Sequence, residues 1–148
     1  MDSLMGEARP LRVIVTGGGT GGHVYPALTT VRAVQRQLAE QGGAAEVVWV
    51  GARGGLEERV AGEAGIEFRA VATGKLRRAR NPLRMLTWRN LKDLSRAPAG
   101  AVQARALVRS LRPDVVVGFG GYVAVPVSIA AWTCRRPVLV HEQTVRLG

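Results

Sequence analysis

Short apolar runs alternate along the chain with longer segments in which apolar residues recur every three or four positions. Short runs rich in valine and isoleucine are typical of strands buried on both faces, and the recurring spacing is typical of helices. Strands that alternate with helices favour a parallel sheet flanked by helices, so the predicted fold class is Rossmann-like α/β. The pattern predicts strands at residues 11–16, 46–50, 68–72, 115–117 and 137–140, and helices at residues 24–40, 56–64, 102–111 and 123–133.

The same pattern indicates the extent of the domain. Residues 1–10 are predicted to be a flexible N-terminus, and residues 11–148 are predicted to form one domain. Residues 75–92 interrupt the alternation of strands and helices, and a helix is expected to begin after Pro82. The sequence Ala-Pro-Ala-Gly at residues 97–100 predicts a break before the next helix.

A glycine-rich turn follows the first predicted strand. Five of the six residues from Gly17 to Gly22 are glycine, and His23 comes directly after them. Glycine lets the backbone approach a ligand closely, and the N-terminus of the following helix favours a negative charge. The turn therefore predicts a site for a ligand that carries phosphate, with a tight turn that binds nothing as the simpler alternative.

Two known phosphate-binding patterns fit this turn poorly. A dinucleotide site expects an acidic residue about 20 positions further on, at the end of the second strand. This chain has Arg53 there, which disfavours NAD and leaves only an NADP interpretation open. A Walker loop expects Lys and then Ser or Thr after its second glycine, where this sequence has His23 and Val24.

The composition is that of a single domain in a reducing compartment. With 148 residues and 47% hydrophobic side chains, the chain can bury a core. We expect neither a cleaved signal nor a membrane span, because no apolar run approaches about 18 residues and the first ten residues lack an apolar core. The lone cysteine, Cys134, cannot form an internal disulfide. No metal site is expected, because the chain has only two histidines in addition to this cysteine.

The net charge of +10 is unevenly distributed. Residues 1–67 hold six basic and eight acidic side chains, whereas residues 68–148 hold fifteen basic and three acidic ones. Nucleic acid, an anionic membrane and a phosphorylated substrate would each complement this excess. Charge alone does not choose among them.

Much of the positive charge lies in residues 75–92, which contain seven basic residues and no acidic one. Apolar residues are interspersed with these charges, as in a basic amphipathic helix that docks on an anionic membrane. An ordinary surface helix that packs its apolar side on the core is the equally open alternative. The predicted membrane-docking residues are Arg80, Leu83, Arg84, Leu86, Trp88 and Arg89.

Polar segments follow three of the predicted strands. The first glycine turn with His23 follows the first strand, a second glycine turn at residues 118–122 follows the fourth, and residues 141–144 follow the fifth. Because parallel strands end at one edge of their sheet, we expect the three segments to converge.

Three sequences, Gly-Gly-Thr-Gly-Gly-His-Val-Tyr-Pro at residues 18–26, Gly-Phe-Gly-Gly-Tyr-Val at 118–123 and His-Glu-Gln at 141–143, carry a family resemblance. In order and spacing the chain resembles the MurG family of peptidoglycan N-acetylglucosaminyltransferases, over nearly all of residues 11–144. The resemblance implies the N-terminal half of a GT-B glycosyltransferase, which transfers N-acetylglucosamine from UDP to the C4 hydroxyl of a diphosphate-linked polyprenyl sugar, lipid I, with inversion and without a metal or other cofactor.

The resemblance also implies a division of labour between two domains. The N-terminal half binds the lipid-linked acceptor, and a C-terminal half, absent from this chain, holds UDP-N-acetylglucosamine. The chain is therefore expected to be inactive by itself and peripheral, on the cytoplasmic face of the plasma membrane. The implied partners are the diphosphate acceptor, an anionic membrane surface and, through the C-terminal domain, UDP-N-acetylglucosamine, with no nucleic acid.

By position, the resemblance assigns an acceptor site to the glycine turns and the last strand end. His23 is the first candidate for the base or for the group that orients the acceptor hydroxyl, Glu142 is the competing base, and a His23 that merely caps the turn is the simpler alternative. Thr144 departs from the family pattern, which has Asn there. The implied acceptor and diphosphate residues are Gly18, Gly19, Thr20, Gly21, Gly22, Gly120, Gly121, Tyr122, His141, Gln143 and Thr144.

Other functions stay open at this point. The departure at Thr144 allows a paralogue that acts on another lipid-linked or natural-product acceptor. Arg53 and the basic second half favour an NADP-linked or nucleic-acid-binding module, which the His-Glu-Gln strand end does not support. A non-catalytic subunit that presents the acceptor at the membrane is the third alternative.

Overall fold

The structure, a computed structural model, describes residues 9–73 and 88–142, and describes residues 88–97 by their backbone alone. Its centre is a five-stranded sheet with the order β3-β2-β1-β4-β5, in which every neighbouring pair is parallel. The predicted parallel sheet is confirmed. The strands are β1 (Leu11–Thr16), β2 (Ala45–Gly51), β3 (Glu67–Ala70), β4 (Val115–Gly118) and β5 (Val138–Val140).

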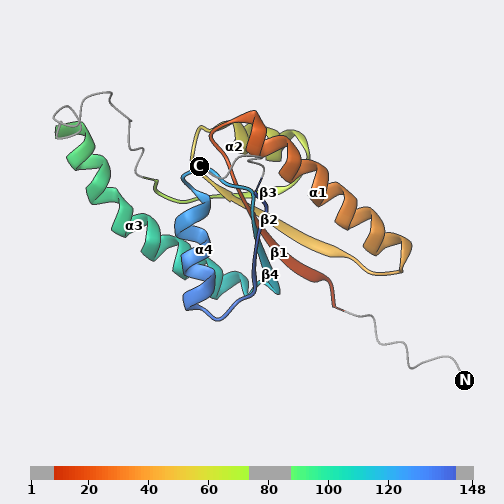
Figure 1. Cartoon of the computed structure of the whole chain (residues 1–148). Helices are drawn as coiled ribbons and strands as arrows, with labels where there is room; N and C mark the ends of the chain where they lie inside the picture. The colour runs from red at the N-terminus through yellow and green to blue at the C-terminus, as the bar shows by residue number, and fades with distance from the viewer. Residues whose placement is uncertain (1–8, 74–87, 143–148) are drawn as a thin grey trace, which may run out of the picture.

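Helices cover both faces of the sheet (Figure 1). Helices α1 (Gly21–Glu40) and α2 (Leu56–Glu63) lie on one face, and α3 (Trp88–Leu111) and α4 (Ala124–Thr133) lie on the other. Among the described residues, no helix combines the length and hydropathy that crossing a membrane requires.

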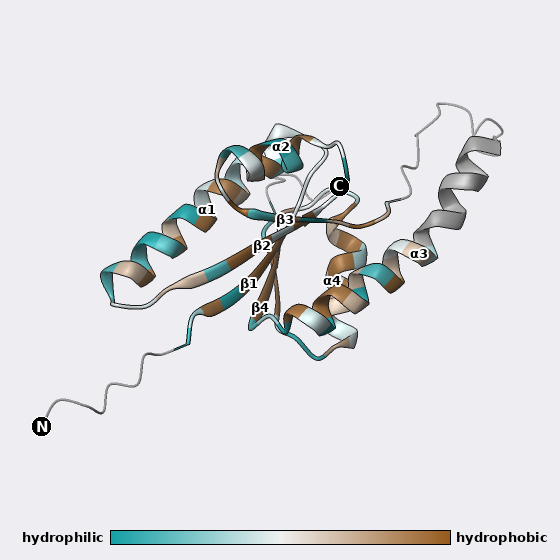
Figure 2. Ribbon diagram, turned by 180° about the vertical axis from the view of Figure 1, so that it is seen from behind, coloured by the Kyte–Doolittle hydropathy of each residue, from teal (hydrophilic) through white to brown (hydrophobic). Residues whose placement is uncertain are grey.

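The central strands are mostly hydrophobic beyond their amino ends, where both of their faces are buried (Figure 2). Val13 and Val15 of β1 point into a core cluster under α1 and α2, while Ile14 between them points into a second cluster under α3 and α4. The three consecutive apolar residues 13–15 therefore contribute to two cores at once.

Most predicted boundaries agree with the structure to within two residues, but the first helix begins earlier than expected. It starts at Gly21, not at residue 24, with Thr20 as its N-cap. The glycine pattern hid this start, because glycine is a poor helix former in general but costs less in a first turn. Gly21 and Gly22 consequently belong to the helix, and only residues 17–20 form the turn itself.

The predicted break at residues 97–100 is wrong, because α3 runs without interruption through Pro98. A Cβ on Gly100 would collide with the carbonyl oxygen of Ala72, so glycine there allows the helix to touch the chain leaving β3. The side-chain oxygen of Gln103 also accepts the Ala72 N–H at 2.8 Å. These tertiary contacts hold a continuous helix although proline inside a helix is unfavourable by about 3 kcal/mol.

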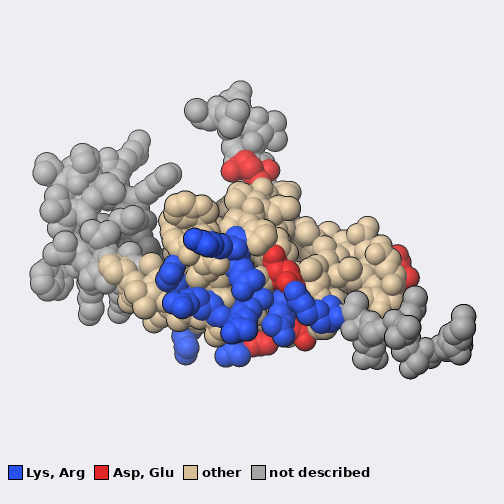
Figure 3. Space-filling model, turned by 90° about the horizontal axis from the view of Figure 1, so that it is seen from below, with Lys and Arg blue, Asp and Glu red and all other residues tan. Residues whose placement is uncertain are grey.

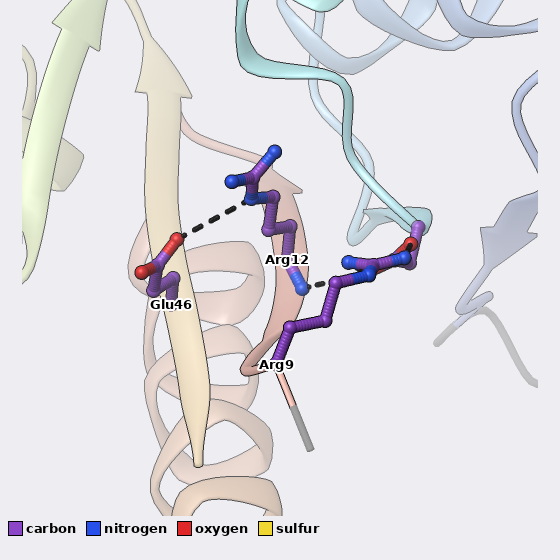
Figure 4. Close-up of polar contacts among 4 residues, drawn as sticks. Arg9, Arg12 and Glu46 are labelled. Carbon is purple, nitrogen blue, oxygen red and sulfur yellow. Dashed lines mark hydrogen bonds and ion pairs between the residues drawn. The ribbon is translucent and has the colours of Figure 1, made fainter. Parts of the chain in front are cut away.

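At the amino ends of the strands, Asp114 ties the entrance of β1 to that of β4. Its carboxylate accepts hydrogen bonds from both Nη atoms of Arg9, at 2.9 and 2.6 Å, and from the backbone N–H of Arg12 at 2.9 Å. Arg12 also pairs with Glu46 of β2 at 3.5 Å (Figure 4). The hydrogen bonds from Arg9 and then from Arg12 lower the pKa of Asp114 from 3.8 to about 2.

This pKa shift predicts a specific acid sensitivity. A carboxylate with a lowered pKa in the folded state stabilises the fold above its unfolded pKa and loses that contribution as the pH falls through the folded value. We expect thermal stability to fall between pH 3.8 and about 2 more steeply in the unmodified chain than in Asp114→Asn. Glu63→Gln, which alters an exposed pair with Arg59 at 3.9 Å, is the control and should leave the slope unchanged. Equal slopes in Asp114→Asn and the unmodified chain would contradict the assignment.

Candidate functional site

The candidate site lies where β1 and β4 end side by side at the centre of the sheet. The strand order reverses between these two strands, and ligands of open α/β sheets bind at such a point. Thr16 pairs with Gly118, and the Phe119 N–H donates to the Thr16 carbonyl oxygen at 2.8 Å. Both glycine turns therefore leave the sheet at the same level.

The two turns touch through their backbones. Gly120 and Gly121 have φ angles of 91° and 84°, which side chains rarely tolerate. A Cβ on Gly121 would collide with the carbonyl oxygen of Gly18 in the first turn. The glycines of the second turn are thus required both by its backbone conformation and by this contact.

His23 projects from the first turn of α1 toward the second glycine turn. A Cβ on Gly120 would lie 2.9 Å from Cδ2 and 3.0 Å from Nε2 of His23. On the other side of the ring, Nδ1 lies 3.1 Å from the hydroxyl oxygen of Thr20. In the tautomer in which Nδ1 donates to that hydroxyl, Nε2 carries a lone pair and can accept a proton.

The N-terminus of α1 offers backbone donors beside His23. The first N–H groups of a helix have no partner inside the helix. Within the described part of the chain, those of Gly21 and Gly22 have no other partner either, whereas the His23 N–H donates to the Thr20 carbonyl oxygen at 3.1 Å. Such free donors at the positive end of a 20-residue helix suit an anion.

Two tyrosines lie at the rim of the turns. The Tyr122 ring is within 3.3 Å of where a Cβ on Gly19 would lie, and the Tyr25 ring is within 3.2 Å of the same point on Gly21. Their exposed fractions are 37% and 53%, so both rings can contact a ligand. Sequence reasoning did not select Tyr25 as a site residue, although its position two residues after His23 was available as a signal.

The segment after β5 joins the site through Phe119. The His141 ring stacks on the buried Phe119 ring at a centroid distance of 5.3 Å, and its backbone N–H donates to the Gly118 carbonyl oxygen at 2.8 Å. Glu142 follows and is exposed. The predicted convergence of the three strand ends is confirmed as far as residue 142, while Gln143 and Thr144 lie outside the described residues.

Two further residues form hydrogen bonds with the first turn, and the sequence reasoning missed both. The indole Nε1–H of Trp49 in β2 donates to the Gly17 carbonyl oxygen at 3.1 Å. The carboxylate of Glu57 in α2 accepts the Gly19 N–H at 3.2 Å. Nothing in the local sequence linked either residue to the turn, because the contacts join residues 32 and 38 positions apart.

The chain matches the description "Glycosyltransferase family 28 N-terminal domain" over residues 13–148. It is 43% identical over 138 residues to a Moorella thermoacetica protein and 39% identical over 136 residues to one from Treponema pallidum. Both are named UDP-N-acetylglucosamine--N-acetylmuramyl-(pentapeptide) pyrophosphoryl-undecaprenol N-acetylglucosamine transferase. The matches cover 93% and 92% of this chain but only 34% and 33% of those relatives, so the chain spans about a third of their length.

A solved structure is similar as well. Acinetobacter baumannii MurG superimposes with a TM-score of 0.69 and 33% sequence identity. The match covers 94% of this chain and 37% of that one. The likeness therefore again concerns one part of a longer protein.

The contact between His23 and the second turn predicts the effect of adding a methyl group to Gly120. Gly120→Ala should displace the His23 ring in addition to straining the backbone, whereas Gly42→Ala, at φ 75° with open space around it, should strain the backbone alone. Each strain costs about 1–2 kcal/mol of unfolding free energy, measured in urea. Histidine-labelled NMR should show a shifted His23 ring signal for Gly120→Ala only, and an unmoved signal would contradict the contact.

Proposed function

The chain belongs to the family of glycosyltransferase family 28 N-terminal domains, and from this premise we propose that it is the acceptor-binding half of an N-acetylglucosaminyltransferase. The proposed reaction transfers N-acetylglucosamine from UDP-N-acetylglucosamine to a polyprenyl-diphosphate-linked sugar, lipid I, with inversion. The predicted fold class, the N-terminal half of a GT-B glycosyltransferase, is confirmed.

The observation that carries the proposal is that free backbone donors and a histidine lie together at the carboxyl ends of the strands. The amides of Gly21 and Gly22 are suited to the oxygens of a diphosphate. His23 lies directly after them, with Nε2 turned toward the second glycine turn. An acceptor held by its diphosphate would therefore bring its sugar close to a group that can take a proton.

In the proposed mechanism, the acceptor hydroxyl gives its proton to Nε2 of His23 as it attacks the anomeric carbon of the donor sugar. The UDP leaving group departs from the opposite side, so the configuration inverts. Thr20 fixes the His23 ring through Nδ1. Glu142, exposed at the adjacent strand end, is the competing base. The donor site is assigned to the part of the relatives' length that this chain does not span.

The proton-acceptor role can be measured in an enzyme in which this chain is joined to the C-terminal part of the Moorella thermoacetica relative. We expect His23→Ala to lower turnover by about a hundredfold, the usual contribution of general base catalysis, without changing the melting temperature. Glu142→Ala should have a smaller effect. Near-normal turnover in His23→Ala would remove His23 from the mechanism and leave Glu142 or a residue of the second domain as the base.

A lipid-linked acceptor also requires the domain to meet a membrane, and α4 presents an exposed apolar face. Val125, Ile129 and Trp132 recur at helical spacing and have exposed fractions of 60%, 55% and 76%. Figure 2 shows α4 as hydrophobic along most of its length. We name these three residues the α4 stripe.

Arginines adjoin the C-terminal end of the α4 stripe. A hollow of about 350 Å³ is lined by five of them, which we name the arginine hollow, together with Thr133 and Cys134, which directly follow Trp132. None of the five forms an ion pair with another described residue. Figure 3 shows basic side chains gathered on this face of the molecule. The five are Arg105, Arg109, Arg112, Arg135 and Arg136.

Apolar and aromatic side chains beside uncompensated arginines suit the interface of an anionic membrane. We therefore assign the α4 stripe and the arginine hollow to membrane docking, on the cytoplasmic face of the plasma membrane. The docking residues predicted from the sequence remain a separate prediction. Arg80, Leu83, Arg84 and Leu86 lie outside the described residues, and the side chains of Trp88 and Arg89 are not described.

Co-sedimentation with vesicles checks this assignment. Binding to phosphatidylglycerol vesicles should exceed binding to phosphatidylcholine vesicles and should weaken with salt. Trp132→Glu should reduce binding at least about tenfold, equivalent to 1.4 kcal/mol, because it removes a large side chain from the interface. The control is Thr30→Glu, an exposed position on α1 across the sheet, which should bind as before. Unchanged binding by Trp132→Glu would exclude the α4 stripe from docking.

A further inference from the structure

The side chain of Glu57 is completely buried beneath the first glycine turn. It rises from the first turn of α2, and its two carboxylate oxygens bind two different loops. Oε2 accepts the Gly19 N–H of the turn after β1 at 3.2 Å, and Oε1 accepts the Ala52 N–H of the loop after β2 at 3.1 Å. One carboxylate thus connects two neighbouring strand ends.

Such a buried carboxylate is costly unless its charge is compensated. No Lys or Arg in the described part of the chain forms an ion pair with Glu57. Its compensation comes from the two amides and from the N-terminus of α2, whose dipole favours an acidic residue in the first turn. The charge is therefore held by backbone groups of the site region itself.

Three glycines from three segments surround this carboxylate. A Cβ on Gly18 would overlap the carboxyl group, one on Gly51 would lie 2.7 Å from Cγ, and one on Gly55 would lie 2.5 Å from Oε2. Glycine at these positions makes room for Glu57. Gly18, which the sequence pattern assigned to ligand binding, is thus accounted for by Glu57 without any ligand.

We propose that Glu57 is a positioning residue for the anion site: by holding the Gly19 N–H it sets the path of the first turn and leaves the Gly21 and Gly22 amides to receive the diphosphate. This inference rests on the proposed function, because it concerns the same site. The Gly19 amide is satisfied internally, so the turn keeps its shape without a ligand. Trp49 holds the start of the same turn by donating its indole Nε1–H to the Gly17 carbonyl oxygen.

Substituting glutamine for Glu57 separates positioning from charge. Glu57→Gln keeps the size of the side chain but replaces one oxygen by an NH₂ group, which cannot accept the N–H of Gly19 or Ala52. If the carboxylate acted only through its charge, its removal would strengthen the binding of an anion. If it positions the turn, its removal weakens that binding, so the two roles differ in sign.

The first measurement is amide hydrogen exchange followed by NMR. In the unmodified chain the Gly19 and Ala52 amides should be protected, and in Glu57→Gln at least one of them should lose about tenfold in protection, the effect of losing one hydrogen bond to a charged group. Glu58→Gln is the matched control, since the neighbouring Glu58 is only partly buried and, among the described residues, accepts a hydrogen bond from the Gly54 N–H only. An unprotected Gly19 amide in the unmodified chain would overturn the proposal.

The second measurement is calorimetry with inorganic pyrophosphate. Affinity should fall about tenfold in Glu57→Gln, as expected when one charge-assisted hydrogen bond no longer shapes the site, and should be unchanged in Glu58→Gln. Tighter or equal binding by Glu57→Gln would overturn the positioning role. If the unmodified chain does not bind pyrophosphate, the diphosphate site of the proposed function fails, while hydrogen exchange still decides whether Glu57 shapes the turn.

A second variant covers the case in which Glu57→Gln does not fold. Gly18→Ala keeps the carboxylate charge but places a methyl group where the carboxyl group lies, and the φ of Gly18 is not in the left-handed region. Its effect therefore comes through Glu57. Loss of Gly19 amide protection in Gly18→Ala supports the proposal, and full protection contradicts it.

Discussion

The backbone contact between the two glycine turns is the constraint on which the rest of the site depends. The parallel pairing of β1 with β4 places Thr16 beside Gly118, so both turns leave the sheet together. They meet so closely that Gly121 has no room for a side chain against Gly18. This contact brings His23, from the N-terminal half of the chain, against Gly120, almost a hundred residues later, and no local interaction could do so.

The site also depends on how charge is distributed around it. The buried carboxylate of Glu57 accepts a hydrogen bond from the first turn, and within the described residues the Gly21 and Gly22 amides that follow the turn have no hydrogen-bond partner. The arginine hollow lies at the C-terminal end of α4. The N-terminal end of α4 is bound to the second glycine turn, because the Ala124 N–H donates to the Gly121 carbonyl oxygen. A ten-residue helix is about 15 Å long, so α4 spans the distance between the second glycine turn and the arginine hollow. The helix thereby links the two halves of the proposed function.

Sequence reasoning predicted the features that depend on neighbouring residues and missed those that depend on contacts between distant segments. The apolar runs at 13–15 and 115–117 predicted strands because burial on both faces favours apolar side chains at consecutive positions. The break expected at Pro98 was wrong, because the contacts of Gly100 and Gln103 with Ala72 outweigh the preference of proline. Glu57 is one of two acidic residues in the first turn of α2, and its complete burial distinguishes it from Glu58.

The sequence by itself determined the order of strands and helices, the parallel sheet, the edge at which the polar segments gather and the family resemblance, because periodicity and glycine placement are written residue by residue. Tertiary structure decided which glycines are free to serve a ligand. Gly18 makes room for Glu57 and Gly121 for the backbone of the first turn, whereas the amides of Gly21 and Gly22 stay free in the described chain. The physical reason is that a glycine in the sequence indicates only that a side chain would not fit at that position, whereas the group that would clash with it lies elsewhere in the fold.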